Sequence, residues 1–252
     1  MTATAVRSRP ATNLRFAGTD KTYADGTVAL TGVDLEIRQG DFVSVVGPSG
    51  CGKSTLLRLA SGLEEPTGGV MEVDRGSLAY VFQDATLLPW RTVEQNVRLL
   101  GELHHLGKGE TRRRAAEAIE LVGLSGFEKH MPHQLSGGMR MRTSLARSLT
   151  LAPSLFLFDE PFGALDEISR ERLNSELLTL FTTQEFAALF ITHSINEAVF
   201  LSTQVAVMSG RPGRIVGRVD VPFPYPRDPE IRYTPRFAEI CAELSDMLRG
   251  AS

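Results

Sequence analysis

The chain has 252 residues, 42% of them hydrophobic, with a formal net charge of -3 and a pI near 6.0. This length and apolar content suffice for one large domain, or one domain with an inserted subdomain, whereas the acidic balance argues against a general nucleic-acid binder. The longest apolar run, Phe186 to Ile191, is far shorter than the roughly 20 residues of a membrane-spanning helix, and two cysteines give no disulfide framework and suit a reducing compartment.

The N-terminal segment predicts a short lead followed by antiparallel strands. Met1 to Pro10 contains two arginines but no apolar stretch of the kind that secretory signals carry. We expect residues 1–12 to form a disordered lead. From Leu14 to Ile37, short alternating segments are interrupted at Asp25-Gly26 and at Thr31-Gly32, a pattern that predicts antiparallel hairpins.

The next segments predict an α/β core that is interrupted by helices. A short apolar strand, Asp41 to Val46, leads through a glycine loop into a helix with leucines at helical spacing, Ser54 to Ser61. Thr92 to Leu149 reads as a helical insertion. Two more apolar strands, Leu155 to Phe158 and Ala188 to Ile191, are separated by a predicted helix and so indicate a parallel sheet. A proline-rich stretch and a last amphipathic helix follow.

The glycine loop has the complete pattern of a phosphate-binding loop, G-x-x-x-x-G-K-S, between a strand and a helix. Its glycines let backbone N–H groups approach phosphates, and the helix N-terminus adds a favourable dipole. Lys53 is expected to bridge the β and γ phosphates and the Ser54 hydroxyl to bind Mg²⁺, while the side chain of Cys51 has no assigned role. The loop reads Gly47-Pro48-Ser49-Gly50-Cys51-Gly52-Lys53-Ser54-Thr55.

Two carboxylates end the apolar strand that begins at Leu155. Asp159 is placed at the strand tip, where it can hold Mg²⁺ through water. Glu160, one residue further on, can face the γ-phosphate and polarise the attacking water. The sequence therefore predicts Mg²⁺-dependent hydrolysis of a nucleotide, and not merely nucleotide binding.

The segment Leu135 to Met139 resembles the LSGG signature of ABC ATPases. Its Ser136, Gly137 and Gly138 start a predicted helix and form a second anion site. The resemblance implies that this site closes over the γ-phosphate that the other subunit of a head-to-tail dimer holds. It also implies that Gln83 contacts Mg²⁺ and the attacking water.

Further matches to the family fall in order along the chain. Asp166, in Gly163-Ala164-Leu165-Asp166, matches the partner-contacting segment, His193 matches the histidine that reaches the γ-phosphate, and Tyr23 matches the aromatic that stacks on adenine. The resemblance implies an α/β fold: a phosphate-loop NTPase core with a mainly parallel sheet, an N-terminal antiparallel β subdomain and an inserted α-helical subdomain. We expect one ATPase domain over residues 13–250. Its parts are a core (13–86 and 151–213), a helical subdomain (87–150) and a C-terminal extension (214–250).

The stretch Phe82 to Val93 is similar to the ATPases of nitrate, sulfonate and taurine importers. This similarity implies a homodimer at the cytoplasmic side of the membrane, bound to a permease, and indirectly to a solute-binding protein, with no nucleic-acid partner. It leaves the transported solute open. The exposed Leu87-Leu88-Pro89-Trp90 cluster fits either permease docking or internal packing. Non-transport ABC ATPases are the alternative; their DNA-repair members usually separate loop and signature widely, whereas Ser136 follows Lys53 by 83 residues.

Overall fold

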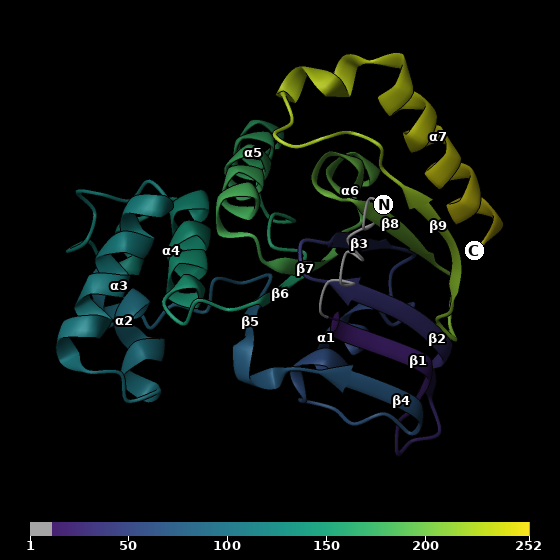
Figure 1. The fold of residues 1–252 in the computed structure, drawn as a ribbon, viewed down its shortest axis with the longest axis horizontal. Helices are drawn as coiled ribbons and strands as arrows, with labels where there is room; N and C mark the ends of the chain where they lie inside the picture. Colours follow the sequence, from purple (N-terminus) through teal and green to yellow (C-terminus); the bar gives the residue numbers. More distant parts are fainter. Residues whose placement is uncertain (1–11, 252) are drawn as a thin grey trace, which may run out of the picture.

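The structure is a computed structural model that describes residues 12–251 (Figure 1). Residues 1–11, most of the predicted lead, lie outside the described residues, and Thr12, its last residue, begins the first strand. Two sheets, a group of three helices at one end of the molecule and further helices around the main sheet make up the fold. Among the helices of this described range, none is both long and apolar enough to cross a membrane.

The main sheet has six strands in the order β5-β6-β7-β3-β8-β9. The first five are parallel to their neighbours, and β9 pairs antiparallel with β8 at one edge. In chain order they are β3 (Phe42–Val46), β5 (Leu78–Val81), β6 (Leu155–Asp159), β7 (Ala187–Ile191), β8 (Gln204–Met208) and β9 (Ile215–Asp220).

The central strands are apolar on both faces because both faces of the sheet are covered. Every residue of β3 and β7 is buried. Alternate side chains of β3 enter different hydrophobic clusters: Phe42 packs with residues of the helices on one face, and Val43 packs on the other face with leucines of the helix that follows β3. The sheet therefore forms a rigid platform for the loops at its carboxyl edge.

The helices on the main sheet are α1 (Lys53–Ser61), α5 (Glu167–Gln184), α6 (Ile195–Leu201) and α7 (Pro235–Gly250). The first lies on one face, and the other three contribute to the cluster on the opposite face. Part of the predicted C-terminal extension thus completes the main sheet as β9 and covers it as α7 (Figure 1). Short 3-10 turns are Arg75–Ser77, Pro132–Gln134 and Pro229–Tyr233.

A smaller antiparallel sheet has the strand order β2-β1-β4, with β1 (Thr12–Thr22), β2 (Val28–Arg38) and β4 (Gly68–Val73). The predicted turn at Asp25-Gly26 is confirmed, since it joins β1 to β2. The predicted interruption at Thr31-Gly32 is wrong. Gly32 lies inside β2 with φ +56°, and its N–H bonds Asp20 at 2.7 Å. Glycine here accommodates an irregularity within a continuous strand.

Three helices form a separate packed unit: α2 (Val93–Leu103), α3 (Lys108–Leu121) and α4 (Gly137–Leu149). Their buried residues, including Val97, Ile119 and Ala146, make their own hydrophobic cluster. In Figure 1 they stand to one side of the two sheets. The expected fold class, a mainly parallel α/β core with an antiparallel N-terminal sheet and inserted helices, is confirmed. The division into numbered parts remains a prediction.

Candidate functional site

The glycine loop after β3 is shaped by positions that only glycine can occupy without strain. Gly52 caps α1 with φ 108°, and a Cβ there would lie 2.7 Å from Leu30 Cδ2 and 2.9 Å from the Ala29 carbonyl oxygen. Lys53 is nearly buried, and its Nζ donates to the carbonyls of Gly47 at 2.8 Å and Pro48 at 2.9 Å. The loop is thus a preformed turn that leads into a helix N-terminus, an arrangement suited to an anion.

Asp159 lies at the carboxyl end of β6, next to the loop. Its Oδ1 accepts a hydrogen bond from Ser54 Oγ at 3.2 Å, and its Oδ2 accepts one from Tyr80 at 3.0 Å. Burial raises the pKa of Asp159, and the two hydrogen bonds oppose that rise. Carboxylate and hydroxyl oxygens are the ligand types that Mg²⁺ prefers, together with substrate phosphates. The residues present therefore fit this ion.

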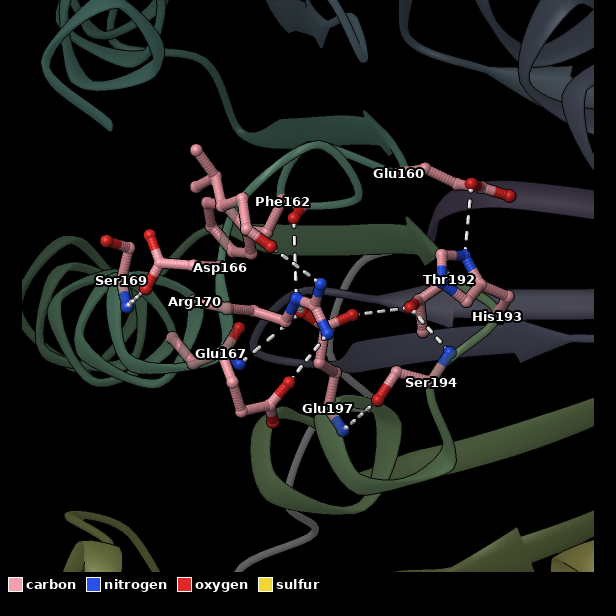
Figure 2. Close-up of polar contacts among 12 residues, drawn as sticks. Glu160, Phe162, Asp166, Glu167, Ser169, Arg170, Thr192, His193, Ser194 and Glu197 are labelled. Atoms are coloured by element: carbon pink, nitrogen blue, oxygen red, sulfur yellow. Dashed lines mark hydrogen bonds and ion pairs between the residues drawn. The ribbon is translucent and has the colours of Figure 1, made fainter. Parts of the chain in front are cut away.

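Glu160 and His193 meet across the ends of β6 and β7 (Figure 2). His193 Nδ1 lies 3.2 Å from Glu160 Oε2, with 26% of the Glu160 side chain and 57% of the His193 side chain exposed. Glu160 has φ 45°, a left-handed backbone that is rare for this residue type, and its N–H bonds the Ile191 carbonyl at 3.0 Å. A strained backbone at the strand tip thus presents the carboxylate to solvent.

Gln83 lies on the same side as this pair. A Cβ added to Gly163 would be 3.7 Å from both Gln83 Nε2 and Glu160 Oε2, so both side chains flank Gly163. The loop after Gln83 is tied to α4 by the buried Arg147, which donates to the carbonyls of Ala85 at 3.1 Å and Thr86 at 3.0 Å. The sequence did not predict this role of Arg147, because a single arginine within an amphipathic helix gives no local sign of a contact with a distant loop.

Tyr23 borders an open hollow of about 310 Å³ over the glycine loop. Its hydroxyl lies 3.2 Å from Thr55 Oγ1, and Lys21 Nζ lies 5.3 Å from its ring centre. Arg211, which the sequence interpretation did not single out, also lines the hollow. The lining residues are Tyr23, Ala29, Ser49, Gly50, Gly52, Lys53, Ser54, Thr55, Glu160 and Arg211.

Ser136 to Gly138 and Asp166 stand at helix starts outside that lining. The predicted site residues Gly47, Pro48, Cys51, Gln83, Asp159 and His193 are also outside it. Ser136 Oγ accepts from the Met139 N–H at 3.2 Å and caps α4, whose first turn contains Gly137 and Gly138. Asp166 caps α5 by accepting from the Ser169 N–H at 3.0 Å, a bond that lowers the pKa of Asp166. Neither helix start borders the hollow in the described part of a single chain.

The geometry thus assembles three functions at one edge of the sheet: an anion-binding loop, oxygen ligands suited to Mg²⁺, and a partly exposed carboxylate beside a histidine. The helix start at Ser136, predicted to be a second anion site, lies outside the lining of the hollow.

Known proteins similar in sequence to this chain are ATP-binding proteins, in agreement with the nucleotide site described above. The profile of the ABC transporter family matches residues 30–163. The chain is 40% identical to the nitrate import ATP-binding protein NrtD of Synechococcus elongatus, covering 88% of this chain and 85% of that protein. It is 43% identical to the aliphatic sulfonates import ATP-binding protein SsuB 1 of Pseudomonas savastanoi pv. phaseolicola, covering 92% and 94%.

A solved structure of an ABC cassette has a similar fold. The dimeric structure of MJ0796, a bacterial ABC transporter cassette, superposes with a TM-score of 0.73 at 31% identity, covering 83% of this chain and 99% of that one. With the profile spanning more than half of the chain and relatives at 40% and 43% identity, the chain belongs to the ABC transporter family and is an ATP-binding subunit that hydrolyses ATP.

Proposed function

We propose that the chain drives import of a small solute through a separate membrane permease, at the cytoplasmic side of the membrane. The similarity to import ATP-binding proteins for nitrate and aliphatic sulfonates supports this, and a small anion of that kind, or taurine, is the proposed solute class. The observation that carries the proposal is an ATPase site joined, through the Gln83 loop, to an exposed aromatic side chain on the helical unit.

In the proposed site, the loop N–H groups and Lys53 bind the β and γ phosphates. Lys53 would exchange the two neutral carbonyls that it now contacts for charged phosphate oxygens, which are stronger acceptors. Ser54, Asp159 and Gln83 would hold Mg²⁺, with Asp159 acting through water. When bound, Mg²⁺ neutralises phosphate charge as the leaving group departs. Tyr23 stacks on the adenine.

Glu160 is the proposed base that polarises the attacking water. His193, 3.2 Å away, restricts the orientation of the Glu160 carboxylate and can reach toward the γ-phosphate. Gln83 lies beside Gly163, as the Glu160 carboxylate does, and would complete the water site. Once the closed dimer holds these groups in place, they would stabilise developing charge without further reorganisation during the chemical step.

We further propose a head-to-tail homodimer. Ser136, Gly137 and Gly138 lie outside the lining of the nucleotide hollow of their own chain, and no contact links them to the glycine loop or to the Glu160–His193 pair in the described residues. A second copy would place its signature helix over that hollow, as the family resemblance implies. Ile168, beside Asp166, is 83% exposed and would be covered in such a dimer.

The proposed permease site lies around Trp90, which is 70% exposed. Its turn is firmly held, because the buried Asn96 side chain accepts from the Leu88 N–H at 2.8 Å and donates to the Arg91 carbonyl at 2.9 Å. Arg147 connects the preceding loop to α4. A rigid aromatic anchor tied to the signature helix can transmit movement between permease and ATPase site.

The test is purification of the tagged chain from detergent-solubilised membranes of its own cell, with mass spectrometry of what remains bound. We expect a permease with the wild-type chain and with Leu63→Ser, a control that alters another exposed apolar residue, 65% exposed. Trp90→Ser should lose the permease and keep basal ATP hydrolysis. Equal permease recovery with Trp90→Ser would contradict the docking site. Recovery of nucleic acid or ribosomes without a membrane protein would overturn the transport proposal in favour of a non-transport ABC ATPase.

A further inference from the structure

Arg170 of α5 holds the backbone that connects Glu160 to Asp166. Its Nη2 donates to the Leu165 carbonyl at 2.8 Å, and its Nε donates to the Phe162 carbonyl at 3.4 Å (Figure 2). Only 19% of the Arg170 side chain is exposed. A planar guanidinium presents donors in a fixed fork, so it can hold two carbonyls in one arrangement. Arg170 therefore fixes the shape of the Phe162–Asp166 segment.

Glu197 of α6 holds the loop that carries His193. Its Oε2 accepts a hydrogen bond from Thr192 Oγ1 at 2.5 Å, and Thr192 Oγ1 in turn accepts from the Ser194 N–H at 3.0 Å. The Glu197 N–H bonds Ser194 Oγ at 3.3 Å. Glu197 is 6% exposed and Thr192 is 1% exposed. Thr192 is thus bonded to the buried carboxylate of Glu197, and Ser194, on the other side of His193, is held by Thr192 Oγ1 and by the backbone N–H of Glu197.

Arg170 and Glu197 join these two segments. Arg170 Nε lies 3.8 Å from Glu197 Oε1, which also accepts from Asn174 Nδ2 at 3.5 Å. Burial raises the pKa of Glu197, and the Thr192 hydrogen bond and the Arg170 charge oppose that rise. Figure 2 shows Arg170 between the Phe162 side and the Thr192 side of the site. A buried carboxylate that lost its cation would be strongly disfavoured.

We propose that Arg170 and Glu197 are positioning residues that fix the partner-facing Phe162–Asp166 segment against the His193 loop, so that a second copy's contact at Asp166 sets the geometry of Glu160 and His193. This inference rests on the proposed roles of Glu160 and His193 and on the proposed dimer. It gives the pair a function beyond stability: the chemical step becomes dependent on dimer closure.

Neither residue lines the nucleotide hollow, so substitution should separate turnover from binding. Arg170→Met and Glu197→Gln should leave the ATP Kd within about two-fold of wild type and lower kcat by about 10- to 100-fold, the range expected when a catalytic group is displaced by up to an ångström. Because the two act through one contact, the double variant should lose little more than the worse single variant.

The matched control is Arg172→Met on the same helix, where the side chain is 72% exposed and pairs with Glu176 at the surface. Purified full chain would be assayed for ATP Kd, for kcat and KM, and for Tm. In a Glu160→Gln background, ATP-dependent dimer would be measured against protein concentration. We expect Arg170→Met to raise the concentration needed for half dimer, and Arg172→Met to leave it unchanged.

The inference is overturned if Arg170→Met, corrected for its folded fraction, turns over ATP as fast as Arg172→Met, or if the losses of the two single variants simply multiply. Should Arg170→Met fail to fold, Arg170→Lys keeps the charge but lacks the fork; an intermediate kcat with unchanged Kd supports the inference and a wild-type kcat overturns it. Wild-type turnover by Glu160→Gln would instead refute the site assignment itself, whichever result Arg170 gives.

Discussion

Gly213, which lies outside the phosphate-binding motif, packs closely against the backbone of the glycine loop. Gly213 pairs with β2, donating to the Ala29 carbonyl at 2.9 Å and accepting from the Thr31 N–H at 3.0 Å. A Cβ at Gly213 would lie 2.2 Å from the Cys51 carbonyl oxygen and 2.6 Å from Met208 Cε. Met208 could move its flexible end, but the Cys51 carbonyl belongs to the loop backbone. Gly213→Ala should therefore push the loop out of its nucleotide-binding shape.

The expected losses of stability and of ATP affinity follow from this steric clash. Overpacking a well-packed site costs about 1–3 kcal/mol, and a clash with backbone should reach the upper end. For a domain of this size each kcal/mol lowers Tm by about 2–4 °C, so Gly213→Ala should lower Tm by about 6–12 °C. Distortion of the loop should also raise the ATP Kd by about ten-fold or more, equivalent to about 1.4 kcal/mol.

Thermal unfolding and equilibrium ATP binding would measure both effects. The matched control is Gly210→Ala in the same loop, where the added Cβ would meet only the Ala251 carbonyl oxygen at 3.8 Å, an ordinary contact. We expect Gly210→Ala to keep the Tm and ATP Kd of the wild-type chain. If Gly213→Ala matched Gly210→Ala in both measurements, the loop would not depend on this close approach, and the steric reasoning would be refuted.

Three further predictions concern the nucleotide hollow. Tyr23→Ala should raise the ATP Kd about ten-fold while Tyr23→Phe should not, as measured by equilibrium binding, because base stacking contributes about 1–3 kcal/mol. Arg211→Ala should raise the ATP Kd by about three- to ten-fold at low salt and by less at high salt; a salt-independent Kd would exclude a charge contact. Burial raises the pKa of Asp159 above 3.8, so its contribution to stability is fully present below pH 3.8 and is lost as pH rises through the folded pKa. Asp159→Asn should accordingly raise the Tm of the nucleotide-free chain at neutral pH and abolish Mg²⁺-dependent turnover; an unchanged Tm in calorimetry would contradict the first part.

Contiguous motifs made the core of the site predictable. The loop from Gly47 to Thr55 and the acidic pair Asp159-Glu160 each follow an apolar strand, and parallel strands bring their carboxyl ends to one edge of the sheet. The contact between His193 and Glu160 follows from the same topology, since β6 and β7 are neighbours. Residue type and strand order together were enough to predict that these residues lie close to one another.

Long-range contacts were not predictable in this way. Arg211 reaches the hollow only because the loop after β8 folds back on β2, and no local pattern marks that return. Gly32 looked like a turn, but pairing with β1 keeps the strand continuous. Ile215–Asp220 pairs with β8 as an edge strand of the main sheet, and no strand was predicted there from the sequence. In each case tertiary pairing decided the structure over local propensity.

The most direct test of the proposed site is a comparison of Glu160→Gln with the wild-type chain for ATP turnover and for molar mass in the presence of ATP and Mg²⁺. We expect turnover to fall by about 10²–10⁴-fold, the range for loss of a general base, ATP binding to persist, and an ATP-bound dimer to accumulate. Wild-type turnover, or a monomer that binds ATP and never dimerises, would contradict the account.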